Sequence, residues 1–256
     1  MLAEPQPSPY DLHFELFGTR VRVHPFFWLF TAFLGWSALE RGFLSLVIWI
    51  VAVFFSILLH EFGHIWMGKL FGSDGYIVLY SFGGLAVGAN DSRRRWQRIL
   101  VLLAGPGIQL AFYVLLWLGE KSMGADHRAR LSEPIDELLH SLKWINLVWP
   151  LMNLLPVWPL DGGQICRELC SIASPQEALR ISLMISGCTA TAIALNGLYA
   201  MNHDGHGLIP HVPDLGSWGL ILFALLAVQS FQLMAMMRRE QPWHYEGPDD
   251  RLPWER

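Results

Sequence analysis

Six stretches of the chain are strongly apolar and contain no Asp, Glu, Lys or Arg. They cover residues 23–39, 43–59, 99–118, 144–160, 181–201 and 215–237. A helix of about 20 apolar residues crosses the hydrocarbon core of a bilayer, and a shorter one suffices where the bilayer thins or protein covers its ends. The pattern therefore predicts an all-α polytopic membrane protein with six transmembrane helices.

The fourth apolar stretch differs from the others because it carries Pro150, Pro156 and Pro159. Proline removes a backbone donor and breaks a helix, and at membrane depth such breaks persist only where protein or a water-filled cavity satisfies the freed groups. The fourth span is thus expected to be interrupted. Its end, residues 153–163, is expected to be a functional loop.

Residues 76–88, between the second and third stretches, are too few to cross a membrane. They are rich in β-forming residues and are divided by Gly83 and Gly84. This pattern predicts a short membrane-associated β-hairpin or re-entrant strand pair, with an interfacial loop as the alternative. Residues 14–23 predict another short strand beside it.

The distribution of Lys and Arg predicts the orientation, because cytoplasmic segments carry the excess of both residues. Six crossings place both termini on one side. With that side cytoplasmic, the inside segments hold Arg20, Arg22, Lys69, Arg93, Arg94, Arg95, Arg98, Arg167, Arg180, Arg238, Arg239, Arg251 and Arg256. The outside segments hold Arg41, Lys121, Arg128 and Arg130. We therefore expect both termini in the cytoplasm and an integral protein of a bacterial cytoplasmic membrane.

These assignments divide the chain into a cytoplasmic segment with a possible short strand (1–24), a six-span membrane domain (25–238) and a cytoplasmic tail (239–256). Residues 1–10 are polar and proline-rich and lack the features of a secretory signal, so the first apolar stretch is expected to remain in the mature protein.

Composition agrees with a membrane protein. Hydrophobic residues make up 53% of the 256 residues and charged residues 16%, which excludes an ordinary soluble domain. The formal net charge of −4 gives no reason to expect a nucleic-acid partner. Three cysteines are too few for a disulfide framework; Cys166 and Cys170 lie one helical turn apart, where structural thiols are favoured over a shared metal.

Candidate chemistry is concentrated in His60-Glu61-Phe62-Gly63-His64, at the end of the second apolar stretch. Residues four apart lie on nearly the same helix face, so the two imidazoles can bind one metal ion, and zinc suits such ligands. Glu61, one step round the helix, is placed to take a proton as general base. Ionisable groups within a membrane span are usually functional, which disfavours a chance pair of histidines.

A catalytic zinc site normally has three protein ligands. Asp161 is the candidate third ligand, since it ends the proline-rich run Asn153-Leu-Leu-Pro-Val-Trp-Pro-Leu-Asp161-Gly162-Gly163. The fourth stretch runs from outside to inside, so its end reaches the depth of His60 and His64. An aspartate before two glycines is more often a turn residue, but beside HEFGH the ligand is favoured.

The HEFGH motif at 60–64 together with NLLPVWPLDGG at 153–163 resembles the site-2 protease family of intramembrane zinc metalloproteases. Gly83-Gly84 and Ala104-Gly105-Pro106-Gly107 are supporting matches. The resemblance implies that His60, His64 and Asp161 hold one zinc ion per chain and that Glu61 is the catalytic base. It also implies that Asn153 positions the substrate carbonyl. Gln109 departs from the family, where asparagine is frequent, and a compact member without PDZ or CBS domains is expected.

The resemblance further implies an endopeptidase that cuts transmembrane segments of single-span membrane proteins near the cytoplasmic face, in regulated intramembrane proteolysis. The expected partners are these substrates and the lipid bilayer, without nucleic acid; the sequence indicates no oligomeric state. An edge strand at 76–88 is a candidate for capturing the unwound substrate by β-augmentation.

Two alternatives remain. One is a different membrane zinc peptidase in which Glu168 is the third ligand. The other is a non-proteolytic metal-binding scaffold or transporter, against which the presence of Glu61 argues. The loop residues His203, Asp204, His206 and His211 are interpreted as a solvated cluster rather than a second metal site.

Overall fold

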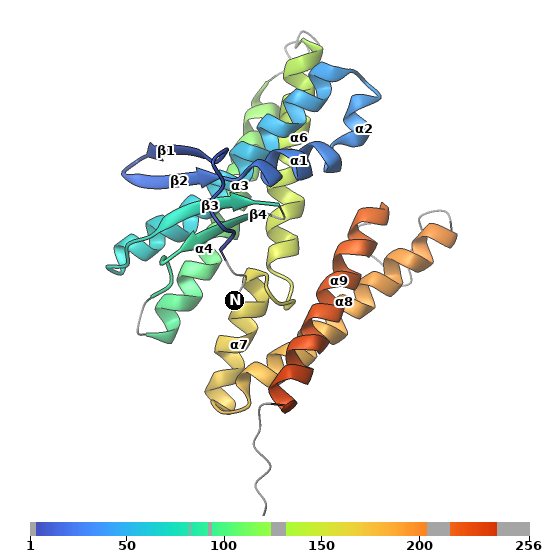
Figure 1. Cartoon of the computed structure of the whole chain (residues 1–256). Helices are drawn as coiled ribbons and strands as arrows, with labels where there is room; N and C mark the ends of the chain where they lie inside the picture. The colour runs from blue at the N-terminus through green and yellow to red at the C-terminus, as the bar shows by residue number, and fades with distance from the viewer. Residues whose placement is uncertain (1–3, 82, 92–93, 124–131, 204–215, 240–256) are drawn as a thin grey trace, which may run out of the picture.

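The computed structural model describes residues 4–81, 83–91, 94–123, 132–203 and 216–239, which are mainly helical with one four-stranded sheet (Figure 1). The strands are β1 (Leu12–Leu16), β2 (Thr19–Val23), β3 (Tyr76–Tyr80) and β4 (Gly83–Val87). The helices are α1 (Pro25–Leu34), α2 (Trp36–Leu39), α3 (Phe43–Leu70), α4 (Arg95–Ser122), α6 (Glu133–Asn153), α7 (Asp161–Ala173), α8 (Ala178–Asn202) and α9 (Gly216–Arg239). The expected helical fold is confirmed. The sheet has four strands, one more than the hairpin and the single N-terminal strand that the sequence predicted.

Four helices in the described part of the chain are long and apolar enough to cross a bilayer: α3, α4, α8 and, within α9, Trp218–Met237. They expose large apolar side chains on their outer surfaces, including Phe55, Leu115, Leu195 and Leu225. So many exposed apolar side chains suit a lipid environment rather than water. The chain is therefore an integral membrane protein, and the six predicted crossings are not confirmed.

The first predicted span is wrong as a continuous helix. Residues 23–39 contain the ten-residue α1 and the short α2, with a break at Gly35. Ten helical residues reach about 15 Å, half of a bilayer core of about 30 Å. A Cβ atom at Gly35 would lie 2.2 Å from the Trp49 ring of α3, so the chain turns where it touches that helix.

The fourth predicted span also has different bounds in the structure. Helix α6 begins at Glu133 and includes Lys143, so its first half is charged, and it continues through Pro150 to Asn153. Residues 154–160 are not helical, as the prolines indicate, and α7 begins at Asp161. The interruption predicted from the prolines is present, whereas the single apolar helix over 144–160 is not.

The N-terminal strand prediction over 14–23 is wrong in one respect, because two strands lie there. β1 and β2 pair in antiparallel register and are joined by a two-residue turn, Phe17-Gly18, with φ angles of 50° and 66°. Positive φ at both positions is typical of the turn that matches strand twist, and a phenylalanine rarely adopts it. Because phenylalanine is not a typical residue of such a turn, the sequence did not indicate a turn at Phe17.

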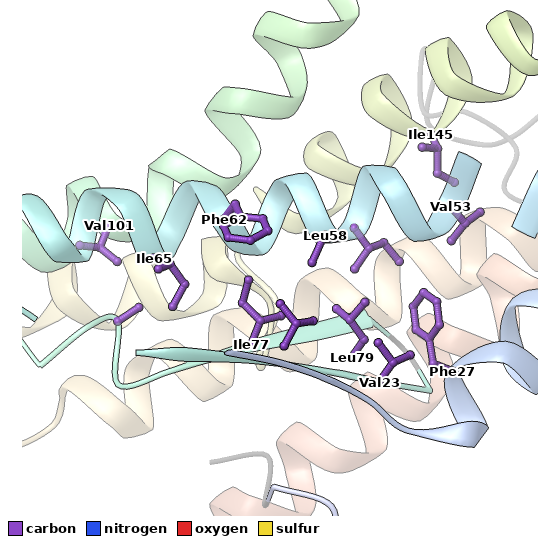
Figure 2. Packing of buried hydrophobic residues seen from close by; sticks show 13 residues of the cluster. Val23, Phe27, Val53, Leu58, Phe62, Ile65, Ile77, Leu79, Val101 and Ile145 are labelled. Carbon is purple, nitrogen blue, oxygen red and sulfur yellow. The ribbon is translucent and has the colours of Figure 1, made fainter. Parts of the chain in front are cut away.

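The sheet packs on α3 through one apolar face. β2 pairs in parallel with β3, and β3 pairs in antiparallel register with β4, which confirms the predicted hairpin. Alternate residues of a strand share a face, and Val23, Ile77 and Leu79 are fully buried beneath α3 (Figure 2). Phe62 and Ile65 contact them from the same helix that carries HEFGH. The sheet therefore lies directly beside the motif.

Helices α8 and α9 form a pair that lies beside α7 (Figure 1). The irregular segment 154–160 packs against this pair through the fully buried Val157. The backbone N–H of Trp158 donates to Ser186 Oγ at 2.7 Å, and Ser186 Oγ in turn lies 2.7 Å from Ser230 Oγ of α9. These contacts hold the segment from which α7 and Asp161 begin.

Candidate metal centre

The structure brings His60, His64 and Asp161 together, although they come from α3 and the first turn of α7. Their exposed fractions are 3%, 6% and 8%, so all three are buried. His60 Nε2 lies 3.2 Å from Asp161 Oδ2, and His64 Nε2 lies 3.5 Å from the same oxygen. The two Nε2 atoms are 3.1 Å apart. In the described part of the chain this is the one group of three or more such side chains that could hold a metal ion.

Hydrogen bonds on the far side of each ring determine which nitrogen carries the proton. The Gln109 amide donates to the Ser56 carbonyl at 3.0 Å, which leaves Gln109 Oε1 to accept from His60 Nδ1 at 2.8 Å. His64 Nδ1 donates to the Val101 carbonyl at 2.7 Å. In a neutral imidazole protonated at Nδ1, Nε2 carries a lone pair. Both Nε2 lone pairs therefore point toward the shared centre.

Three acceptor atoms thus meet without a donor between them. Asp161 Oδ2 is buried and has no hydrogen-bond partner, which is costly for a carboxylate unless a cation compensates it. Ligands about 2.0 to 2.2 Å from a tetrahedral zinc ion lie about 3.3 to 3.6 Å from one another. The observed separations of 3.1 to 3.5 Å are close to these values. Two imidazoles and a carboxylate in this arrangement fit zinc.

Glu61, on α3, lies beside this group, and its side chain packs against strand β4. Its side chain is 5% exposed, and the backbone of Ala86 hydrogen-bonds to its carboxylate. A Cβ atom at Gly84 would lie 2.3 Å from Glu61 Cγ, so only glycine leaves room for the glutamate. The hairpin therefore holds Glu61 in place, which accounts for the Gly83-Gly84 match seen in the sequence.

A methyl group at Gly84 should displace Glu61 without removing a metal ligand. We expect Gly84→Ala to lower peptide-bond cleavage about 100-fold, near the lower end of what a general base contributes, with zinc content unchanged. Cleavage of a membrane substrate and zinc per chain, measured on the same preparation, check this. Gly107→Ala is the matched control, because a Cβ atom there meets nothing within 4 Å. Full activity of Gly84→Ala would show that Glu61 is not held by β4.

Close packing of α3 on α4 also depends on glycine. A Cβ atom at Gly105 would lie 2.3 Å from His64 Nε2, and one at Gly63 would lie 2.5 Å from the Ala104 carbonyl oxygen. The Ala104-Gly105-Pro106-Gly107 match thus corresponds to the place where α4 approaches the metal-binding face of α3. The motif was visible in the sequence, but its contact with His64 was not.

Gln109 is a functional residue that sequence reasoning missed. It is fully buried and orients His60, and an outer partner of this kind raises the basicity of a metal-binding histidine. The sequence marked it only as a departure from a family pattern. Its position four residues after Gly105, on the helix that packs against HEFGH, was the available signal.

The structure does not bring every candidate to the centre. Asn153 ends α6 and is 9% exposed; in the described part of the chain its side chain donates to the Trp149 carbonyl at 3.1 Å and to none of the three ligands. Glu168 lies on α7 but pairs with Arg98 at 2.6 Å. Of the predicted outer loop cluster only His203 lies within the described residues, where its Nδ1 donates to the Tyr199 carbonyl.

The cysteine pair belongs to no group of three or more candidate metal ligands among the described residues. Cys166 and Cys170 are free and half-buried on α7. Burial raises the pKa of the Cys166 thiol to about 11, and the neighbouring Cys170 adds to the effect, so the thiol is protonated at neutral pH. This favours the interpretation of the two cysteines as structural thiols.

Comparisons with known proteins identify several relatives of the chain. Stage IV sporulation protein FB of Bacillus subtilis is 29% identical over 217 residues, which are 83% of this chain and 65% of that protein. Putative zinc metalloprotease sll0528 of Synechocystis is 31% identical over 182 residues, 70% of this chain and 44% of that protein. Zinc metalloprotease MJ0392 of Methanocaldococcus jannaschii is 27% identical over 192 residues, 74% of this chain and 54% of that protein. The chain thus spans about half to two thirds of these relatives.

A solved structure shares the fold. The site-2 protease from Methanocaldococcus jannaschii superposes with a TM-score of 0.59 at 23% identity, over 88% of this chain and 95% of that chain. The family model described as Peptidase family M50 matches residues 48–124 and 122–193, which include HEFGH, Gln109 and Asp161. The resemblance drawn from the motifs is therefore confirmed, and the chain belongs to Peptidase family M50.

Proposed function

We propose that this chain is a zinc-dependent intramembrane endopeptidase that cleaves transmembrane segments of membrane-anchored proteins near the cytoplasmic face. The observation that carries the proposal is the convergence of three buried acceptor atoms, from His60, His64 and Asp161, with the carboxylate of Glu61 beside them. The names of the relatives as zinc metalloproteases support the choice of metal.

Each residue has a separate task in this proposal. His60, His64 and Asp161 would hold the zinc ion, which when bound supplies Lewis-acid polarisation of the scissile carbonyl. The Glu61 carboxylate accepts a proton from the attacking water and passes it to the nitrogen of the leaving amine. Gly84 and Ala86 hold Glu61 in position. Asn153 is proposed to orient the substrate carbonyl, for which its place at the end of α6 is the support.

Membrane depth follows from the length of α3. Its 28 residues reach about 42 Å, more than a bilayer core of about 30 Å. His64 precedes the end of the helix at Leu70 by six residues, or about 9 Å, so the centre lies below one membrane surface. Basic residues are more numerous at that end of the membrane helices (Lys69, Arg95, Arg98 and Arg180) than at the other end (Arg41 and Lys121), which supports a cytoplasmic location for that surface. Both termini are proposed to lie on the same side. Cleavage near the cytoplasmic face is proposed on this basis.

The substrate must be unwound locally, because a membrane helix hides its amides in internal hydrogen bonds. In the described sheet β4 is an edge strand, and Ala86 on that strand contacts Glu61. An extended segment that pairs with this edge would pass beside the proposed base. Single-span membrane proteins are the proposed substrates, since one helix without tertiary partners unwinds most readily.

Metal removal tests the proposal. We expect the protein, purified in detergent, to contain one zinc ion per chain and to cleave a single-span membrane protein in proteoliposomes. Chelation should abolish cleavage, and one equivalent of zinc should restore it, because the proposed mechanism relies on the zinc ion to polarise the carbonyl. Zinc analysis and gel-based cleavage of the same samples give the result. Cleavage that persists in the zinc-free protein would overturn the proposal.

A further inference from the structure

Helix α7 carries the third ligand and is held at both ends. At its start, Cβ atoms on Gly162 and Gly163 would lie 2.2 and 2.6 Å from backbone atoms of Leu154 and Trp158, so this end fits tightly against the preceding segment. Its second half lies against the beginning of α4 (Figure 1). The position of Asp161 therefore depends on how α7 docks at its far end as well as at its near end.

The far end is held by two arginines of the first turn of α4. Arg98 Nε donates to Glu168 Oε1 at 2.9 Å, and Arg98 Nη2 donates to Glu168 Oε2 at 2.6 Å. The exposed fractions of the two side chains are 28% and 18%, so this two-point ion pair is partly shielded from water. Arg95 Nη2 donates to the carbonyl of Ser171, in the last turn of α7, at 3.2 Å. Carbonyls in a last turn lack helical partners, and this bond satisfies one of them.

The ion pair connects the ligand helix to the helices that carry the histidines. Glu168 follows Asp161 by seven residues, two helical turns or about 10 Å, so both project from nearly the same face of α7. That face presents Asp161 to α3 and Glu168 to α4. Because α4 packs directly on His64 through Gly105, a shift of α7 relative to α4 moves Asp161 relative to both histidines.

We infer that Arg98 and Glu168 are positioning residues that set the place of Asp161 and thereby the affinity of the centre for metal. The inference rests on the proposed zinc site and extends it. If the pair is lost, the far end of α7 is held to α4 less firmly, chiefly by the hydrogen bond from Arg95 to Ser171, and a smaller fraction of molecules presents all three ligands together. Apparent affinity falls in proportion to that fraction.

Zinc binding to the full-length protein in detergent micelles tests this inference. We expect Glu168→Gln, which keeps the shape but loses the charge, to raise the zinc Kd about tenfold, the change that follows if about a tenth of the molecules present all three ligands together. Arg98→Gln should raise the Kd in the same direction but by less, because Arg95 Nε lies 3.9 Å from Glu168 Oε2 and remains in this variant. Exchanging the charges, with Arg98→Glu and Glu168→Arg together, should return the Kd to within about threefold of the unaltered protein, since an acidic residue is also favourable in the first turn of α4.

Two further measurements separate positioning from a general loss of stability. The thermal midpoint of the metal-free protein reports folding, and the visible absorption of the cobalt(II)-loaded protein reports whether Asp161 still binds. We expect Glu168→Gln to change the cobalt spectrum with little change in the midpoint. Glu177→Gln is the matched control, because Glu177 pairs with Arg180 at 3.4 Å at the start of α8, where both side chains are about half exposed.

An unchanged zinc Kd in Glu168→Gln, or a charge exchange that leaves binding as weak as in the single variants, would overturn the inference while leaving the proposed function intact. Absence of zinc binding by the unaltered protein would instead contradict the proposed site itself, and the positioning role with it.

Discussion

Replacing Glu61 by glutamine should lower cleavage by about 10²- to 10⁴-fold while the protein retains its zinc. Glutamine has nearly the same shape, and its carbonyl oxygen can still accept the hydrogen bond from the Ala86 backbone. Its amide cannot take a proton from water at neutral pH. Glu61 is also outside the group of three converging ligand atoms, so the metal should remain.

Initial cleavage rates of a single-span substrate and zinc content, measured on the same samples, check this prediction. The Glu61→Gln variant also separates an enzyme from a metal-binding scaffold. A scaffold would keep its biological activity in this variant, whereas a protease would lose it. Cleavage at the unaltered rate would remove Glu61 from the mechanism, and loss of zinc would indicate that the glutamate is a ligand instead.

Asp161→Ala should weaken zinc binding by more than about 100-fold, because loss of an outer partner of a ligand alone costs about 10- to 100-fold. The variant leaves the Nε2 atoms of His60 and His64 3.1 Å apart and removes the carboxylate that would bind the ion directly. Cleavage should fall with zinc occupancy. Isothermal titration of the metal-free protein with zinc, in the presence of a competing chelator, measures the effect.

The same titration on Glu168→Ala distinguishes the two candidate third ligands. Glu168 is engaged by Arg98 at two points, so its loss should shift the affinity far less than the loss of Asp161. If Glu168→Ala proved the more damaging of the two, the proposed ligand set would be wrong.

The histidine pair was predictable because its geometry is local. Four residues on one helix place two side chains on one face wherever the helix lies, so His60 and His64 need no tertiary information to converge. The same holds for the four long apolar helices, whose composition alone suits a bilayer. Pro156 and Pro159 likewise predicted the interruption after α6, since a missing backbone donor acts at its own position.

Features that depend on neighbours distant in the chain were mispredicted or missed. Residues 23–39 are apolar enough for a span, yet the chain breaks at Gly35 where it meets Trp49. The turn at Phe17 requires a positive φ that phenylalanine rarely adopts, so the first strand pair was not expected. Gln109 gained its role only when α4 was placed beside His60.

The sequence by itself determined a membrane-embedded helical chain, a histidine pair spaced to bind one metal ion with a neighbouring glutamate, and a proline-interrupted segment that ends in Asp161. Tertiary structure alone decided that the Asp161 carboxylate faces both imidazoles, that Gln109 and Val101 direct the Nε2 lone pairs inward, and that β4 confines Glu61. The physical reason is the separation along the chain over which each effect acts. Helix periodicity and hydropathy act over a few neighbouring residues, whereas a metal site requires atoms from α3 and α7 to lie within a few ångströms, which only the packing of the whole chain establishes.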